Sequence, residues 1–295
     1  MSTATVAQVP IQRPHGAIVL EGQINGQPAA FLSDNGSDAT LIDESFARSH
    51  GMAVSKSAKG LNTGLSTVPT GSTEGTITIG DAFKATGQFV TADLGAVSRG
   101  LDRPIAGVLG GDALAAFVVV VNPAANWIAF GLHDHLRVTQ QGAPDAAPAK
   151  IAFAPGYRIS AQINGNPVSL KIDYGSVRSA VSLRADTWDR VIPSEARTAQ
   201  SATSMRADGS MTGSQQLGTA KQLKLSDDVW IGDVPVLRRS PSVRSSNEGL
   251  LGLGILGSGV TTLDTAKGAL WLYPAGQGVR VQAENAPAVP RKPAP

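Results

Sequence analysis

The chain has 295 residues, of which 42% are hydrophobic and 16% charged, and its formal net charge is +2. This balance allows a large buried core in one or two domains, and it argues against the basic surface of a nucleic-acid-binding protein. The sequence contains no cysteine, which excludes disulfides, thiolate zinc sites and cysteine nucleophiles. No apolar run reaches the length that a membrane-spanning helix needs.

Short strands are predicted along most of the chain. Residues 1–15 lack the charged and apolar regions of a signal peptide, and we expect them to be flexible. Runs of β-branched and apolar residues, bounded by Gly, Pro and other turn residues, follow at 17–20, 76–79, 118–121 and 127–130. This pattern predicts a mostly-β protein. The low charge, the absence of cysteine and a Pro-rich end favour an exported protein, either periplasmic or secreted.

The chain contains an internal repeat. The segment GQINGQPAAFLSDNGSDATLID at 22–43 aligns with AQINGNPVSLKIDYGSVRSAVS at 161–182, at a constant offset of 139 residues (173 minus 34). Further on, AGVLGGDAL at 106–114 aligns with EGLLGLGIL at 248–256, at an offset of 142 (249 minus 107). A spacing shared over two landmarks indicates a duplicated supersecondary unit.

The repeat predicts two lobes, at 16–137 and 151–274. Residues 138–150, which are rich in Ala and Pro, are expected to form the linker between them. Residues 275–295 are expected to form a disordered Pro-rich tail. In each copy, Ile-Asn-Gly predicts a tight hairpin turn between two strands.

In both copies an Asp ends an apolar run and begins a Gly-Ser turn, as Asp34 in the first copy and Asp173 in the second. These motifs and the downstream Val108-Leu109-Gly110 and Leu250-Leu251-Gly252 resemble the pepsin/retropepsin family of aspartic peptidases, and the pattern is most similar to bacterial retropepsin-like domains duplicated in one chain. The resemblance implies a bilobal, pepsin-like fold with two barrel-like lobes. It also implies a catalytic Asp34/Asp173 dyad, on which Ser37 and Ser176 would orient the carboxylates and Gly36 and Gly175 would allow the tight turns.

The same resemblance implies an endopeptidase that binds a peptide or protein substrate between the lobes and needs no cofactor. Because both halves lie in one chain, we expect a monomer. Gly-rich segments take the place of the family's flap, with Leu65, Ser66 and Thr67 as candidates in the first copy and Met205, Arg206 and Met211 in the second.

Two residues depart from the family pattern. The family has Thr or Ser directly after each catalytic Asp, where the hydroxyl group joins the two lobes, and this chain has Asn35 and Tyr174. Asn can both donate and accept hydrogen bonds and could replace that contact in part, whereas Tyr is too large for the same space. An alternative reading is therefore a catalytically impaired module that binds peptide or protein without cleaving it.

Two further motifs favour structural roles. Residues 252–257 spell the dinucleotide-binding pattern GxGxxG, but no strand-helix-strand unit surrounds them. His133 and His135 alternate as two residues on one strand face would, but no third ligand follows, so no metal site is predicted.

Overall fold

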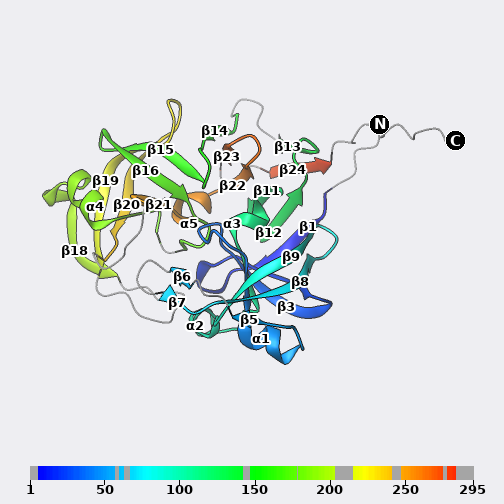
Figure 1. Ribbon diagram of the computed structural model, residues 1–295. Helices are drawn as coiled ribbons and strands as arrows, with labels where there is room; N and C mark the ends of the chain where they lie inside the picture. Colours follow the sequence, from blue (N-terminus) through cyan, green and yellow to red (C-terminus); the bar gives the residue numbers. More distant parts are fainter. Residues whose placement is uncertain are drawn as a thin grey trace.

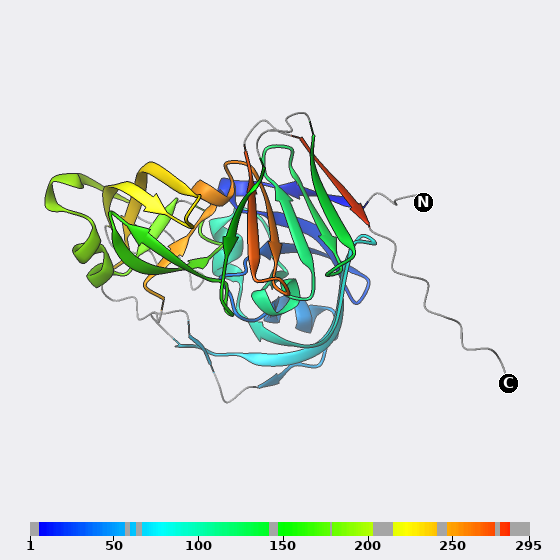
Figure 2. The same cartoon turned by 90° about the horizontal axis from the view of Figure 1, so that it is seen from above.

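The computed structural model describes residues 6–56, 60–62, 67–141, 147–177, 179–202, 215–240, 247–274 and 278–283. These residues form mostly β-strands, arranged as two barrel-like lobes and a sheet that joins them. Figure 2 shows the second barrel, in green and yellow, on the left and the first lobe, in blue and cyan, with the joining sheet on the right. The predicted mostly-β, bilobal fold is confirmed.

The first barrel is a six-stranded sheet that closes on itself. Its strand order is β2 (Val19–Ile24), β3 (Gln27–Ser33), β10 (Gly107–Leu109), β4 (Leu41–Asp43), β9 (Phe83–Ala92) and β8 (Gly71–Ile79). Pairing of β2 with β8 closes it, and β5 (Ser55–Lys56) extends the edge. The short helices α1 (Glu44–Ser49), α2 (Gly95–Gly100) and α3 (Gly111–Leu114) connect its strands.

The second barrel repeats this order. It consists of β15 (Arg158–Ile163), β16 (Asn166–Ile172), β21 (Gly249–Leu251), β17 (Val181–Leu183), β20 (Trp230–Arg238) and β19 (Gln215–Lys224). Pairing of β15 with β19 closes it, and β18 (Arg197–Ala202) continues beyond β19. Helices α4 (Ala185–Val191) and α5 (Leu253–Leu256) and the 3-10 turn η2 (Ser194–Ala196) complete this lobe.

The joining sheet contains strands from both halves of the chain. Its order is β14 (Ala149–Ala152), β23 (Ala269–Tyr273), β22 (Val260–Asp264), β11 (Val118–Asn122), β12 (Trp127–Gly131) and β1 (Gln8–Gln12). The sheet continues from β1 into β2, beside the 3-10 turn η1 (Pro14–Gly16). Two separate pairs, β6 (Leu61–Asn62) with β7 (Thr67–Val68) and β13 (Leu136–Gln141) with β24 (Gly278–Ala283), lie outside the three sheets (Figure 1).

The predicted hairpin turns are confirmed in both lobes. Asn25 and Gly26 have φ of 51° and 80°, and Asn164 and Gly165 have φ of 50° and 79°. Positive φ at both central residues is the turn that matches the twist of a two-stranded hairpin, and Asn-Gly adopts it at the lowest cost. Because the turn sets the register, apolar side chains of β3 and β16 face the interior just before each Asp.

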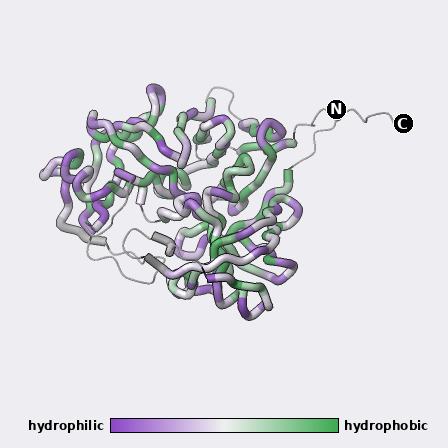
Figure 3. Tube along the Cα trace, in the orientation of Figure 1, coloured by the Kyte–Doolittle hydropathy of each residue, from purple (hydrophilic) through white to green (hydrophobic). Residues whose placement is uncertain are grey.

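One apolar core runs through the molecule. It contains Phe31 and Leu109 in the first barrel, Val121 in the joining sheet, and Leu170 and Trp188 in the second barrel. Figure 3 shows the same arrangement, with hydrophobic segments along the strands and hydrophilic ones at the turns. The lobes therefore share a core and hold the two Asp turns in a defined relation.

Three segments expected to lack structure contribute strands. Residues 8–12 of the expected flexible segment form β1, and residues 138–141 of the expected linker form part of β13. The expected disordered tail contributes β24, in which Val279 and Val281 are buried against neighbours that include Val138. For the residues in these strands the expectations were wrong, because composition does not show which open sheet edge will accept a segment's backbone hydrogen bonds. Residues 142–146 and 284–295 lie outside the described residues.

Candidate active site

Each candidate Asp lies at the same place in its barrel. Asp34 directly follows β3 and donates its N–H to the carbonyl of Leu109 at 3.0 Å, while Asp173 directly follows β16 and donates to Leu251, also at 3.0 Å. In both cases the acceptor belongs to the parallel neighbouring strand. The repeat seen in the sequence therefore brings the two Asp residues to equivalent strand ends.

Backbone amides hold each carboxyl group in its turn. Asp34 Oδ1 accepts from the N–H groups of Gly36 at 2.9 Å and Ser37 at 3.3 Å. Asp173 Oδ1 accepts in the same way from Gly175 at 2.8 Å and Ser176 at 3.1 Å. The backbone N–H groups of each turn therefore fix the orientation of its carboxyl group.

The two turns interlock around their glycines. A Cβ atom at Gly36 would overlap the carboxyl group of Asp173, and a Cβ atom at Gly175 would overlap the carboxyl group of Asp34. Only glycine leaves room for such an approach of backbone to side chain. The reciprocal contact shows that the turns face each other across an approximate twofold axis.

The two carboxyl groups are close enough to affect each other's ionisation. Burial raises the pKa of Asp34 and that of Asp173 above the ordinary aspartate value. The charge of Asp34 and the contact with its side chain raise the pKa of Asp173 further, and the same contact lowers the pKa of Asp34. Two close carboxyl groups cannot both ionise cheaply, so the pair retains one proton.

Asn35 joins the lobes from its position after the first Asp. Its side chain is fully buried. Its Nδ2 donates to the carbonyl of Ile172 at 2.9 Å, and its Oδ1 accepts from the N–H of Tyr174 at 2.8 Å. The carboxamide therefore contacts the second Asp turn on both sides of Asp173, as only a group that donates and accepts can do.

Tyr174 does not occupy the equivalent space. Its ring is buried, and its hydroxyl group forms a hydrogen bond with Thr261 Oγ1 in β22 at 2.7 Å. The side chain thus anchors the second Asp turn to the joining sheet. The connection between the turns is one-sided, since the side chain after Asp34 crosses to the other lobe's turn and the one after Asp173 packs into the core.

The expected role of the Ser37 and Ser176 hydroxyl groups is not what the structure shows. Ser37 Oγ donates to the carbonyl of Ala39 at 2.7 Å, so its one proton is already used. Ser176 Oγ forms a hydrogen bond with Ser179 Oγ at 3.0 Å. Both serines orient the carboxyl groups through their backbone N–H groups, and their side chains stabilise the turns.

Two residues of the second half reach the first Asp turn, and sequence reasoning did not identify either of them. Tyr157, in the turn before β15, donates its hydroxyl to the carbonyl of Gly111 at 2.7 Å. Lys171, in β16, donates its ammonium group to the carbonyl of Gly36 at 2.9 Å and to Asp38 at 2.6 Å. A lysine in an otherwise apolar run was the only visible clue, and the run alone does not reveal its partner.

Most of the candidate flap residues lie outside the described residues, namely Leu65, Ser66, Met205, Arg206 and Met211. Thr67 begins β7, which pairs antiparallel with β6.

The two other motifs have structural positions. Gly252 precedes α5 and packs against the backbone of Ser176 and Ser179. His133 bridges Asp264, at 2.8 Å from Nδ1, and the carbonyl of Ala115, at 3.0 Å from Nε2. Among the described residues no group of three His, Cys, Asp or Glu side chains could hold a metal ion, and no described helix is long and apolar enough to cross a membrane.

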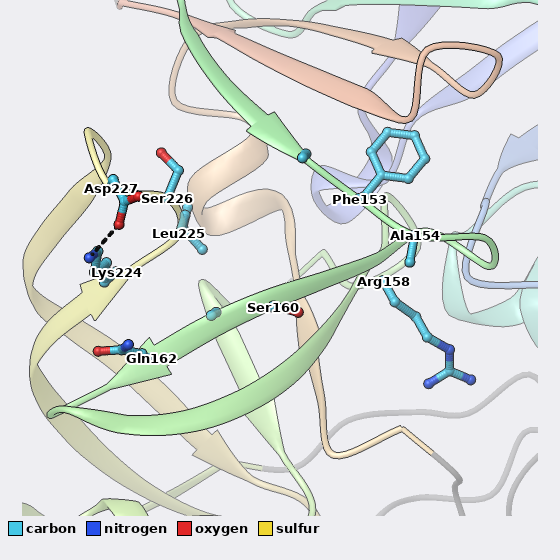
Figure 4. Close-up of a pocket in the computed structure, with 11 residues that line it drawn as sticks. Phe153, Ala154, Arg158, Ser160, Gln162, Lys224, Leu225, Ser226 and Asp227 are labelled. Carbon is cyan, nitrogen blue, oxygen red and sulfur yellow. Dashed lines mark hydrogen bonds and ion pairs between the residues drawn. The ribbon is translucent and has the colours of Figure 1, made fainter.

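A hollow of about 510 Å³ lies on the second barrel, apart from the dyad. Its lining includes Arg158, Gln162 and the ion pair of Lys224 with Asp227, whose charged atoms are 2.8 Å apart. Figure 4 shows the pair at one end and Arg158 at the other. Neither Asp34 nor Asp173 contributes to this hollow.

Residues 20–113, which include the Asp34 turn, match the family model described as aspartyl protease. No curated protein matches the chain. Among the solved structures that match is basic 7S globulin from soybean, at 15% sequence identity and a TM-score of 0.48, with 92% of this chain and 95% of that chain covered. The family match thus covers the first lobe, and the second lobe lies outside it.

Proposed function

We propose that the protein is an aspartic endopeptidase in which Asp34 and Asp173 form the catalytic dyad. The observation that carries this proposal is the reciprocal packing of each turn's glycine on the other turn's carboxyl group. Two aspartates in unrelated turns would have no reason to interlock in this way. The substrate would be an extended peptide or protein segment bound between the lobes, and the family match of the first lobe agrees with this chemistry.

The chemistry follows from one proton shared by two carboxyl groups. The ionised Asp34 takes a proton from a water molecule as the water oxygen attacks the carbonyl carbon of the peptide bond. Protonated Asp173 gives its proton to the carbonyl oxygen, which produces a neutral tetrahedral diol. When this diol collapses, Asp34 gives the proton it took from water to the leaving nitrogen as the C–N bond breaks. The ionised Asp173 takes the proton of one diol hydroxyl group, so that an amine and a carboxylic acid leave and the dyad returns to its starting state. The step needs acid and base together, as a dyad with separated pKa values provides.

The contacts of Asn35 and Tyr174 favour turnover over the binding-only alternative. Loss of activity would follow if Tyr174 forced the carboxyl groups apart or filled the space beside them. Its hydroxyl group instead contacts Thr261 in the joining sheet, and each carboxyl group still packs on the glycine of the other turn. Asn35 supplies two hydrogen bonds between the turns, which support the geometry that catalysis requires.

The test is digestion of a diverse peptide mixture between about pH 3 and pH 8, with products identified by mass spectrometry. Asp34→Asn and Asp173→Asn are the test variants, because the amide keeps the size of the side chain and removes its acid-base chemistry. Asp227→Asn is the matched control, since this side chain is 96% exposed and pairs with Lys224 on the second barrel.

Cleavage by the wild type and the control, lost in both dyad variants, would support the proposal, and the cleaved sites would define specificity. Cleavage that survives in either dyad variant would assign the activity to another group or to a contaminant. A folded wild type that cleaves no peptide, but binds one at a site competed by a non-cleavable tetrahedral analogue, would establish the binding module instead.

A further inference from the structure

Lys171 is a buried cation beside the dyad. Its side chain is 6% exposed, and it lies on β16 two residues before Asp173. A lysine is almost never buried to this extent unless its charge is paired and hydrogen-bonded. Here the ammonium group crosses to the first lobe, where it contacts the carbonyl of Gly36 and the carboxylate of Asp38.

The contact with Gly36 connects the ammonium charge to Asp34. The carbonyl of Gly36 and the N–H of Ser37 belong to the same peptide unit. Lys171 donates to the carbonyl end of this unit at 2.9 Å, and the N–H end donates to Asp34 Oδ1 at 3.3 Å. A cation on the carbonyl oxygen polarises the peptide and strengthens its N–H as a donor. The relay therefore favours the ionised form of Asp34.

The other half of the dyad has no matching residue. At the repeat's offset of 139, the position that corresponds to Lys171 is Leu32 (171 minus 139). Leu32 packs against the buried apolar cluster that contains Val19 and Val108, and a leucine cannot donate to the turn of Asp173. The duplicated frame thus gives the two carboxyl groups nearly equal backbone contacts, and Lys171 makes them unequal.

We propose that Lys171 is a positioning residue that makes the dyad asymmetric, so that Asp34 is the ionised base and Asp173 carries the proton. This inference rests on the proposed peptidase function for its consequence in catalysis. The charge of Lys171 also lowers the pKa of both aspartates, against the dominant effect of burial. Other titratable groups lie near the dyad. Asp38 pairs with Lys171, and the hydroxyl groups of Tyr157 and Tyr174 are buried. Burial lowers the pKa of Arg239, and the charge of Asp173 raises it.

The test follows the ionisation of the dyad directly, by carbon-13 NMR of protein labelled at the aspartate carboxyl carbons. Asp34→Asn and Asp173→Asn assign the two resonances. In the wild type, Asp34 should ionise at the lower pH and Asp173 at the higher. In Lys171→Met, which keeps the unbranched apolar stem and removes the charge, the first ionisation should move up by roughly one pH unit, since an opposite charge at this range shifts a pKa by that order.

Two variants distinguish this electrostatic role from simple packing. Asp38→Asn leaves Lys171 in place without its counter-charge, and Asp38 is 92% exposed, so the first ionisation should move to lower pH. Lys221→Met removes an equal charge from a side chain that is 80% exposed, and the ionisation should stay where it is. A role in packing alone would not shift the dyad in opposite directions in Lys171→Met and Asp38→Asn.

The inference would be overturned if the first ionisation of the dyad shifted no more in Lys171→Met than in Lys221→Met. It would also be overturned if Asp173, and not Asp34, lost the first proton in the wild type. If Lys171→Met does not fold, Asp38→Asn decides alone, and an ionisation that stays or rises in this variant would equally refute the role of Lys171. The NMR titration needs no turnover, so an inactive wild type would refute the peptidase and leave this result intact. Where the wild type cleaves peptides, the acid limb of kcat/KM should move with the NMR ionisation.

Discussion

Asp173→Asn should make the protein more stable at neutral pH while it abolishes catalysis. Burial, followed by the charge of Asp34, raises the pKa of Asp173 from 3.8 to about 8. The unfolded chain releases this proton near the ordinary aspartate pKa. The folded protein retains the proton over the pH window between that pKa and the raised pKa of the folded state. Because the folded pKa is raised, the stability that the proton contributes is complete below the ordinary pKa and is lost as pH rises through this window.

The size of the effect follows from one additional bound proton. Within the window the free energy of unfolding falls by about 1.4 kcal/mol per pH unit. Between pH 5 and pH 7 the wild type should therefore lose about 2 to 3 kcal/mol that the variant retains. The Asn amide does not titrate, and its NH₂ group can donate to Asp34 as a protonated carboxyl group can.

The assay is urea unfolding at pH 5, 6 and 7, followed by the fluorescence of the tryptophans, of which Trp188 is fully buried. The difference between the two proteins at each pH isolates the dyad, because every titrating group outside it is common to both. Equal pH slopes for the wild type and Asp173→Asn would refute the reasoning, and so would a variant that is less stable than the wild type at pH 7.

Three more substitutions probe the contacts around the dyad. Asn35→Ala removes both hydrogen bonds to the second Asp turn and should lower the free energy of unfolding by about 2 to 4 kcal/mol in urea titrations; a change below 0.5 kcal/mol, the range of ordinary surface substitutions, would contradict this. Tyr174→Phe should cost about 1 to 2 kcal/mol in the same assay, because it leaves the partner hydroxyl in the joining sheet buried and unpaired; a cleavage rate that falls with stability intact would show that the tyrosine hydroxyl acts on the dyad. Gly175→Ala places a methyl group against the carboxyl group of Asp34 and should lower kcat/KM by roughly 100-fold. Gly232→Ala is the control, because its Cβ atom would meet its nearest neighbour at an ordinary contact distance of 3.7 Å, and it should cleave at the wild-type rate.

These tests all probe the unequal surroundings of the two dyad aspartates. The duplicated frame supplies each Asp with a strand end, an amide pair and an interlocking glycine. Asn35, Tyr174 and Lys171 break that symmetry at three neighbouring positions, each with a different partner. A duplicated gene product is free to differentiate its halves in this way, whereas a homodimer built from one repeat is not.

The sequence by itself determined the architecture and the two Asp turns, since these depend on local and repeated signals. Asn-Gly turns require positive φ, alternating apolar residues require a half-buried strand, and the constant offset between copies requires equivalent positions in two lobes. From these, Asp34 and Asp173 could be placed at matching strand ends before any coordinates were known. The residue types around them also indicated that the family's usual connection between the lobes had changed.

Only the tertiary structure decided how that connection was replaced. Asn35 and Ile172 are 137 positions apart, and the sequence does not show that the Asn carboxamide spans the second turn while the Tyr174 ring turns away. Nor does it show that Lys171 meets Gly36, or that residues 8–12 and 278–283 add strands to open edges. Such contacts depend on which surfaces meet after the barrels have closed, and local propensity carries no information about that meeting.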